Sequence, residues 1–174
     1  MPNWCENVVR VHADTDGELQ RFVAYVRDYN EDPKKDYPFS FNKIIPLPSE
    51  LQGVRSPTQI CTPDEYHEWI KEHQPTYENG GRPITKVMSE RFKKQYGVDN
   101  WYDWQTIKWG TKWDITDENM FTEIDGTTAE YRFDTAWGPP EGIYEHLVET
   151  FPDHEINWYY HEPNMQMAGY LGVV

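Results

Sequence analysis

Carboxylates crowd the last third of the chain, and their spacing limits the chemistry that they can do. Glu130 and Asp134 share one face of an alternating segment, but about 13 Å separates them at the rise of a strand. The two carboxylates of a glycosidase lie ~5–9.5 Å apart, so these two do not form such a pair. A pair across strands, such as Asp114 with Glu130 or Asp134, would raise one pKa and could serve catalysis. A solvated acidic face is the simpler interpretation, and we prefer it.

The negative charge is concentrated in one region. The chain has 16 Lys and Arg against 30 Asp and Glu, a formal net charge of −14. Residues 113–174 contain Arg132 as their single Lys or Arg against 13 Asp and Glu, a net charge of −12. Nucleic acids and anionic membranes attract Lys and Arg, so this region favours neither as a partner. A basic protein fits better. The acidic surface that we expect to meet it consists of Asp114, Glu130, Asp134, Glu141, Glu145 and Glu149.

The histidines have the wrong spacing for a metal site. His67 and His73 lie six residues apart, about 240° around a helix, so they do not share a face. His154 and His161 differ in parity on one expected strand and point to opposite sides. We therefore predict no metal site and no cofactor.

The two cysteines do not form a disulfide framework. Cys5 stands beside Glu6, which raises a thiol pKa, so we expect a small buried residue. Cys61 precedes an expected helix, whose N-terminus lowers a thiol pKa, but nothing supplies a partner base. The first residues contain neither a basic stretch nor an apolar run, and no segment approaches 18 apolar residues. We expect a cytoplasmic protein.

Four tryptophans, Trp101, Trp104, Trp109 and Trp113, fall within 13 residues. Each buried Trp removes ~150–250 Å² from water, so a core that joins two parts of the chain is the preferred interpretation. A platform on which a ligand stacks is the alternative. An enzyme of unrecognised type would place its site beside these rings, in a cleft between a helical insertion and a sheet. Its lining would be Trp101, Asp103, Trp104, Lys108 and Trp113.

Hydrophobic periodicity predicts an α+β fold in one domain, residues 1–174. Apolar residues alternate with polar ones in the expected strands, which are residues 7–13, 113–116, 129–136, 154–161 and an edge strand in 166–174. Thr15 and Glu18 have the spacing of a capping box and predict a helix after the first strand. Ile143, Leu147 and Phe151 predict a second helix. The order is βαββαβ, that of a ferredoxin-like antiparallel sheet with helices on one face.

A mainly helical subdomain, residues 38–110, interrupts this order between the first helix and the second strand. The sheet part then consists of residues 1–37 and 111–174. Within the insertion, residues 39–48 allow at most a short edge strand because of their two prolines, and 74–83 read as a loop. Capping and periodicity predict helices at 62–73, 84–96 and 100–110.

Two surfaces are candidates for binding nucleic acid. On helix 84–96 a small basic patch consists of Lys86, Arg91, Lys93 and Lys94. We interpret it as a solvated face and keep DNA or RNA binding as an alternative. RNA can also stack on the aromatic residues of an open ferredoxin-like sheet. The residues assigned to that face offer at most one good ring among three carboxylates, which disfavours this mode. They are Arg10, His12, Asp114, Glu130, Arg132, Asp134, Asn157, Tyr159 and His161.

Four motifs spread over almost the whole chain carry a resemblance to known proteins. They are Met-Pro-Asn-Trp-Cys-Glu-Asn at 1–7, Phe-Asn-Lys-Ile-Ile-Pro-Leu-Pro at 41–48, Trp-Tyr-Asp-Trp at 101–104 with Trp-Gly-Thr-Lys-Trp-Asp at 109–114, and Phe-Asp-Thr-Ala-Trp-Gly-Pro-Pro at 133–140 followed by Phe-Pro at 151–152. With these motifs the chain resembles the YubB-type proteins of plasmids and phages. The resemblance implies a ferredoxin-like domain and a mobile element as the source. It implies no activity and no catalytic residues.

These observations lead to one expected function and two alternatives. The first is a non-catalytic interaction protein of a phage or plasmid, which presents its acidic surface to a basic protein in the bacterial cytoplasm. Counter-defence or nucleic-acid mimicry would be its purpose. The alternatives are the enzyme with a site between insertion and sheet, and the nucleic-acid binder that uses helix 84–96. The oligomeric state stays open.

Overall fold

The computed structural model describes residues 3–29, 36–73, 81–115 and 120–172. The chain divides into unit 1, Met1–Pro46 with Lys108–Val174, and unit 2, Leu47–Ile107. The short helix α2 (Phe41–Ile44) and Trp109 therefore lie in unit 1, although both fall within the predicted insertion. In place of the short edge strand considered for this segment, Ser40 caps α2 and its hydroxyl accepts the Lys43 N–H at 3.2 Å.

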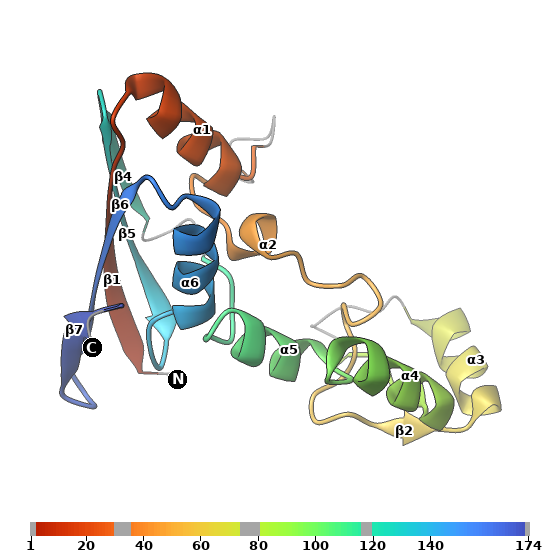
Figure 1. The fold of residues 1–174 in the computed structure, drawn as a ribbon. Coiled ribbons are helices and arrows are strands. Elements are labelled where there is room, and N and C mark those ends of the chain that lie inside the picture. Colours follow the sequence, from red (N-terminus) through yellow and green to blue (C-terminus); the bar gives the residue numbers. More distant parts are fainter. Residues whose placement is uncertain (1–2, 30–35, 74–80, 116–119, 173–174) are drawn as a thin grey trace. The chain divides into compact units, whose positions relative to one another are not determined.

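Unit 1 is built on a five-stranded antiparallel sheet with the order β4-β5-β1-β6-β7. The strands are β1 (Trp4–His12), β4 (Phe121–Asp125), β5 (Thr128–Ala136), β6 (Glu155–Glu162) and β7 (Met167–Tyr170). Because β1 and β4 both run antiparallel to β5, helix α1 (Asp16–Val26) begins a connection between two parallel strands with a third between them, and this connection also contains unit 2. Helix α6 (Glu141–Thr150) connects β5 to β6, which are likewise parallel with β1 between them. Helices α1, α2 and α6 cover one face of the sheet (Figure 1). The ferredoxin-like α+β fold is confirmed, with β7 added at one edge.

Alternation along the strands separates the core from solvent. In β1, Val9 and Val11 are buried against the helices, and Arg10 and His12 are exposed on the other face. The capping box of Thr15 and Glu18 starts α1 as predicted. Aromatic rings fill much of the space between sheet and helices, and the fully buried ones include Phe22, Phe39, Phe41, Tyr131, Trp109 and Trp158.

A buried amide fixes the register of the central strands. Asn7 lies on the core face of β1 and is 1 % exposed. Its Nδ2 donates to the Cys5 carbonyl at 2.9 Å and to Thr135 Oγ1 at 2.8 Å. Its Oδ1 accepts the Trp158 indole N–H at 3.0 Å. The side chain thus ties β1 to β5 and β6, since a buried polar group that lost these partners would cost about 1–3 kcal/mol.

The predicted strand at 113–116 is wrong where the structure describes it, because residues 113–115 form no strand and residue 116 lies outside the described residues. The strand that pairs with β5 is β4, at Phe121–Asp125. Asp114 takes another role, since its carboxylate accepts hydrogen bonds from Phe41 N–H at 2.7 Å and Asn42 N–H at 2.9 Å. Ser40 Oγ and Ile115 N–H donate as well, at 2.9 and 2.8 Å. The carboxylate therefore holds the start of α2.

Unit 2 combines three helices with a short parallel strand pair in its described residues. The elements are β2 (Ile60–Cys61), α3 (Pro63–Glu72), β3 (Ile84–Thr85), α4 (Lys86–Tyr96) and α5 (Trp101–Lys108), whose last residue belongs to unit 1. Helix α4 begins two residues later than predicted because Ile84 and Thr85 pair with β2. Of the loop predicted at 74–83, residues 74–80 lie outside the described residues. No helix in the described ranges is long and apolar enough to span a bilayer.

Candidate binding surface on the open face of the sheet

The face of the sheet that the helices of unit 1 leave open carries an excess of negative charge. The strand registers place six carboxylates there against two guanidinium groups, a formal charge of −4 with neutral histidines. The carboxylates belong to Glu6, Glu123, Asp125, Glu130, Asp134 and Glu155, and the guanidinium groups to Arg10 and Arg132. Trp4, Phe121, Tyr159 and Tyr170 add aromatic rings. The prediction that this face carries at most one good stacking ring among three carboxylates is therefore wrong.

One carboxylate at the centre of this face is neutralised. Glu130 lies opposite Arg10 in the register of β1 and β5, and Arg10 Nε donates to Glu130 Oε2 at 2.6 Å. Arg132 Nε donates to the other carboxylate oxygen at 2.6 Å. The bonds from Arg10 and then Arg132 outweigh partial desolvation and lower the pKa of Glu130. Both arginines are therefore engaged, and Glu130 is not free to bind another cation.

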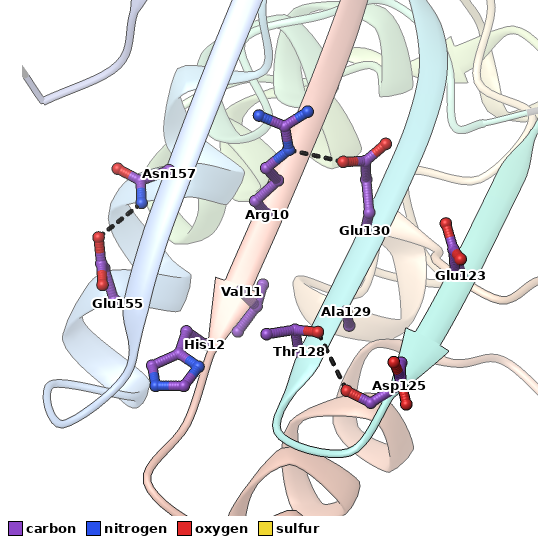
Figure 2. A pocket seen from close by; sticks show the side chains of 10 residues that line it. All are labelled: Arg10, Val11, His12, Glu123, Asp125, Thr128, Ala129, Glu130, Glu155 and Asn157. Atoms are coloured by element: carbon purple, nitrogen blue, oxygen red, sulfur yellow. Dashed lines mark hydrogen bonds and ion pairs between the residues drawn. The ribbon is translucent and has the colours of Figure 1, made fainter.

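The carboxylates around a hollow at one end of the face have no such partner. The hollow has a volume of about 470 Å³ and opens between Arg10, His12 and the ends of β4, β5 and β6 (Figure 2). Glu123, Asp125 and Glu155 line it, and their side chains are exposed. Glu155 accepts a hydrogen bond from Asn157 Nδ2 at 2.8 Å. Within the described part of the chain, none of the three forms an ion pair.

A second group of carboxylates lies further along β1. Glu6 stands opposite Asp134 in the register, so two negative charges face each other across the strands. Desolvation and then the charge of Glu6 raise the pKa of Asp134. His161 Nδ1 lies 3.4 Å from Glu6 Oε2 on the other side. Asp134 forms no hydrogen bond or ion pair with any residue that the structure describes, so this pair attracts a cation.

The six residues of the predicted acidic surface do not form one surface. Glu130 and Asp134 lie on the open face, as predicted. Asp114 is off the sheet at the start of α2, where burial raises its pKa and four hydrogen bonds counter the rise. The remaining three lie on the exposed side of α6, over the opposite face of the sheet (Figure 1). They are Glu141, Glu145 and Glu149.

The five residues of the predicted cleft belong to different units. Trp101, Asp103 and Trp104 lie in unit 2, and Lys108 and Trp113 in unit 1. Trp104 is 5 % exposed, as expected of a core residue, but Trp113 is 39 % exposed. Asp103 accepts a hydrogen bond from Asn100 Nδ2 at 2.8 Å, and its N–H donates to Asn100 Oδ1 at 2.9 Å at the start of α5. Its carboxylate therefore has a local structural role.

The basic patch of α4 is largely compensated. Arg91 pairs with Glu50 at 2.6 Å and Lys93 with Asp99 at 3.0 Å. Lys86 lies 4.0 Å from Glu90. Asp99 is buried, yet hydrogen bonds from Ser89, Thr58 and Lys93 outweigh its desolvation and lower its pKa. These ion pairs leave little net positive charge for a phosphate backbone.

Neither cysteine is poised as a nucleophile. Burial raises the pKa of Cys5 to about 11, and the residue is fully buried as predicted. Burial, then the charge of Glu65, raises the pKa of Cys61, against the lowering expected from its place before α3. Among the described residues, no three His, Cys, Asp or Glu side chains converge on a point where a metal ion could bind.

Comparison with known proteins finds a family similarity in the C-terminal part of the chain. Residues 108–173 match the family model of the ferredoxin-like domain in Api92-like protein. The crystal structure of the protein Api92 from Yersinia pseudotuberculosis is similar at a TM-score of 0.45 and 12 % identity, over 98 % of this chain and 93 % of that one. No curated protein matches. The family model thus names Api92-like proteins, whereas the motifs indicated the YubB type. The matched residues 108–173 are similar to the ferredoxin-like domain of Api92-like proteins, and they contain β4 to β7 of the sheet.

Proposed function

We propose that the protein acts by binding and not by catalysis, and that the open face of its sheet receives a basic segment of a partner protein. The observation that carries this proposal is the hollow lined by Glu123, Asp125 and Glu155, three exposed carboxylates that form no ion pair with any described residue. Lysine and arginine side chains from a partner would complete these pairs. Complementary charge of this kind increases association rate and selects partners.

The same charges oppose nucleic acid at this face. Its four rings could stack on bases, but phosphates would approach an excess of four negative charges. Arg10 and Arg132 are already bound to Glu130. A basic protein therefore fits the face better than RNA does.

The proposal also includes the source and the kind of partner. The motif resemblance supports a phage or plasmid protein that works in the cytoplasm of its bacterial host. Its partner would then be a basic host or phage protein. A nucleic-acid-binding defence protein is one such target, because it already presents Lys and Arg to a negatively charged surface.

Two variants with equal charge test the proposal. One replaces Glu123, Asp125 and Glu155 by Gln, Asn and Gln on the open face, and the other replaces Glu141, Glu145 and Glu149 by Gln on α6. The probe is a fluorescent nine-residue peptide of alternating Lys and Gly, as long as β1, and its anisotropy is measured at low salt. At 0.2–1 kcal/mol for each exposed charge pair, we expect the open-face variant to bind about tenfold more weakly. The α6 variant should bind like the wild type.

The salt dependence supplies a second measurement. The screening length falls from about 10 Å at 0.1 M salt to about 3 Å at 1 M, so binding should vanish at molar salt. If both variants lose the same amount of affinity, the peptide responds to the net charge of the protein alone. That result, or binding that persists in 1 M salt, would refute a site on the open face.

A further inference from the structure

Three exposed tryptophans stand in a row at the end of the open face far from the hollow. Trp4 begins β1, Trp137 follows β5, and Trp113 lies between them. The ring centroids of Trp4 and Trp113 are 6.3 Å apart, and those of Trp113 and Trp137 are 6.5 Å apart. Trp4 is 47 % exposed, Trp113 39 % and Trp137 43 %. Contiguous exposed apolar surface is a feature of interaction sites, so we ask what these rings could bind.

The backbone keeps one of these rings in place at a local energetic cost. Trp137 has φ +67°, a conformation that bulky residues rarely adopt. Its N–H donates to the Asn3 carbonyl at 2.8 Å, which joins the end of β5 to the start of β1. The arrangement therefore presents the ring beside Trp113 and does not bury it.

Two of these rings already contact a cation of the same chain. Lys112 Nζ lies 4.2 Å from the ring centre of Trp113 and 5.7 Å from that of Trp137. An ammonium group at these distances is attracted by the negative face of an indole. The patch is thus an aromatic surface that already accommodates one cation of its own.

Negative charge lies next to the third ring. Trp4 stands opposite Ala136, and two residues further along the strands Glu6 stands opposite Asp134. Diagonal neighbours in a sheet are ~7–8 Å apart, within reach of an indole and a long side chain. A cation over Trp4 would therefore also meet two facing carboxylates, and it would relieve their repulsion.

We infer that Trp4, Glu6 and Asp134 form a subsite for an arginine side chain of the basic partner, an inference that rests on the proposed function. A planar guanidinium can stack on an indole and donate to a carboxylate at the same time, which an ammonium does less well. A phosphate or a second copy of this chain would bring negative charge to the same carboxylates. Eight residue steps along β1 separate Trp4 from His12 at the hollow, about 26 Å, so one extended segment can contact both places.

The test compares two nine-residue peptides, alternating Arg and Gly or Lys and Gly, on the full chain at low salt. The variants are Trp4→Ala, Asp134→Asn and Trp101→Ala, the last as a matched control in unit 2. We expect the wild type to prefer the Arg peptide, and Trp4→Ala and Asp134→Asn to reduce that binding about three- to tenfold. Trp101→Ala should leave it unchanged. In nitrogen–proton NMR spectra, the Trp4 indole signal should shift with the Arg peptide.

The outcomes separate the subsite from the proposed function. If Trp4→Ala keeps the preference for Arg, or if both peptides lose affinity equally, the arginine subsite is overturned. The proposed function then still stands where the hollow variant weakens binding. If the wild type binds neither peptide, both proposals are overturned. Trp4→Phe provides a ring-preserving check, since it should retain part of the preference.

Discussion

Removal of the Asp114 side chain should destabilise unit 1 although the residue lies outside the open face. In Asp114→Ala, four donors lose their acceptor: Ser40 Oγ, two N–H groups at the start of α2, and the N–H of Ile115. Phe41 is fully buried and Ile115 is 6 % exposed, so water does not readily replace the carboxylate at their N–H groups. The substitution therefore leaves two orphaned buried backbone donors, whereas the third buried donor, the Ser40 hydroxyl, can rotate to another acceptor.

The magnitude follows from those two donors. A hydrogen bond to a charged group contributes roughly 1.5–3 kcal/mol, so their loss should lower the free energy of unfolding by about 3 kcal/mol. For a unit of this size, about 4 °C of melting temperature corresponds to each kcal/mol, hence a fall of about 12 °C. Amide hydrogen exchange should show the loss locally, as faster exchange at Phe41 and Asn42.

A matched control distinguishes this cap from a general effect of charge. Asp134→Ala removes the same side chain from unit 1 but breaks no hydrogen bond to a described residue, and it also relieves repulsion with Glu6. Its melting temperature should equal or exceed that of the wild type. The capping role of Asp114 is refuted if Asp114→Ala changes the free energy of unfolding by less than about 1 kcal/mol with both amides still protected.

Two further predictions concern titration. The folded state raises the pKa of Asp134, so it holds this proton more tightly than the unfolded chain does. The contribution of this group to stability is present at low pH and is lost as pH rises above its unfolded value of 3.8. Asp134→Asn should remove this loss from the pH dependence of urea unfolding. Cys5, with its pKa raised to about 11, should react with a thiol reagent at neutral pH only as fast as the protein unfolds, whereas Cys61 reacts first. Prompt labelling of both thiols would contradict the burial of Cys5.

Local signals were enough to predict some of the elements. The capping boxes at Thr15 and Thr62 depend on residues three positions apart, and both helices start there. Asp114 could not be placed in this way, because the Phe41 N–H that it accepts lies 73 residues away. Alternation between Trp113 and Ile115 resembled a strand, but the tertiary hydrogen bonds of Asp114 determine the conformation there.

The composition of the open face was predicted only in part for a related reason. Glu130 and Asp134 were assigned correctly because alternation in β5 is regular. Glu123 and Phe121 were missed because the strand expected to pair with β5 was placed several residues too early. Trp4 and Glu6 were missed because β1 was expected to begin only at residue 7. A strand boundary determines which side chains reach a face, and boundaries depend on partners that lie far away in the chain.

The register of β1 and β5 explains why the face retains unpaired charge. The same two strands place Arg10 against Glu130 but Glu6 against Asp134, so they make one ion pair and one repulsive pair. A shift by one residue would separate Glu6 from Asp134, but it would also turn every core side chain of β1 to solvent. The hydrogen bonds of Asn7 further oppose such a shift. The core thus holds the two carboxylates together. His161 lies beside Glu6, and a cation from outside the chain would neutralise Asp134, which has no ion-pair partner among the described residues.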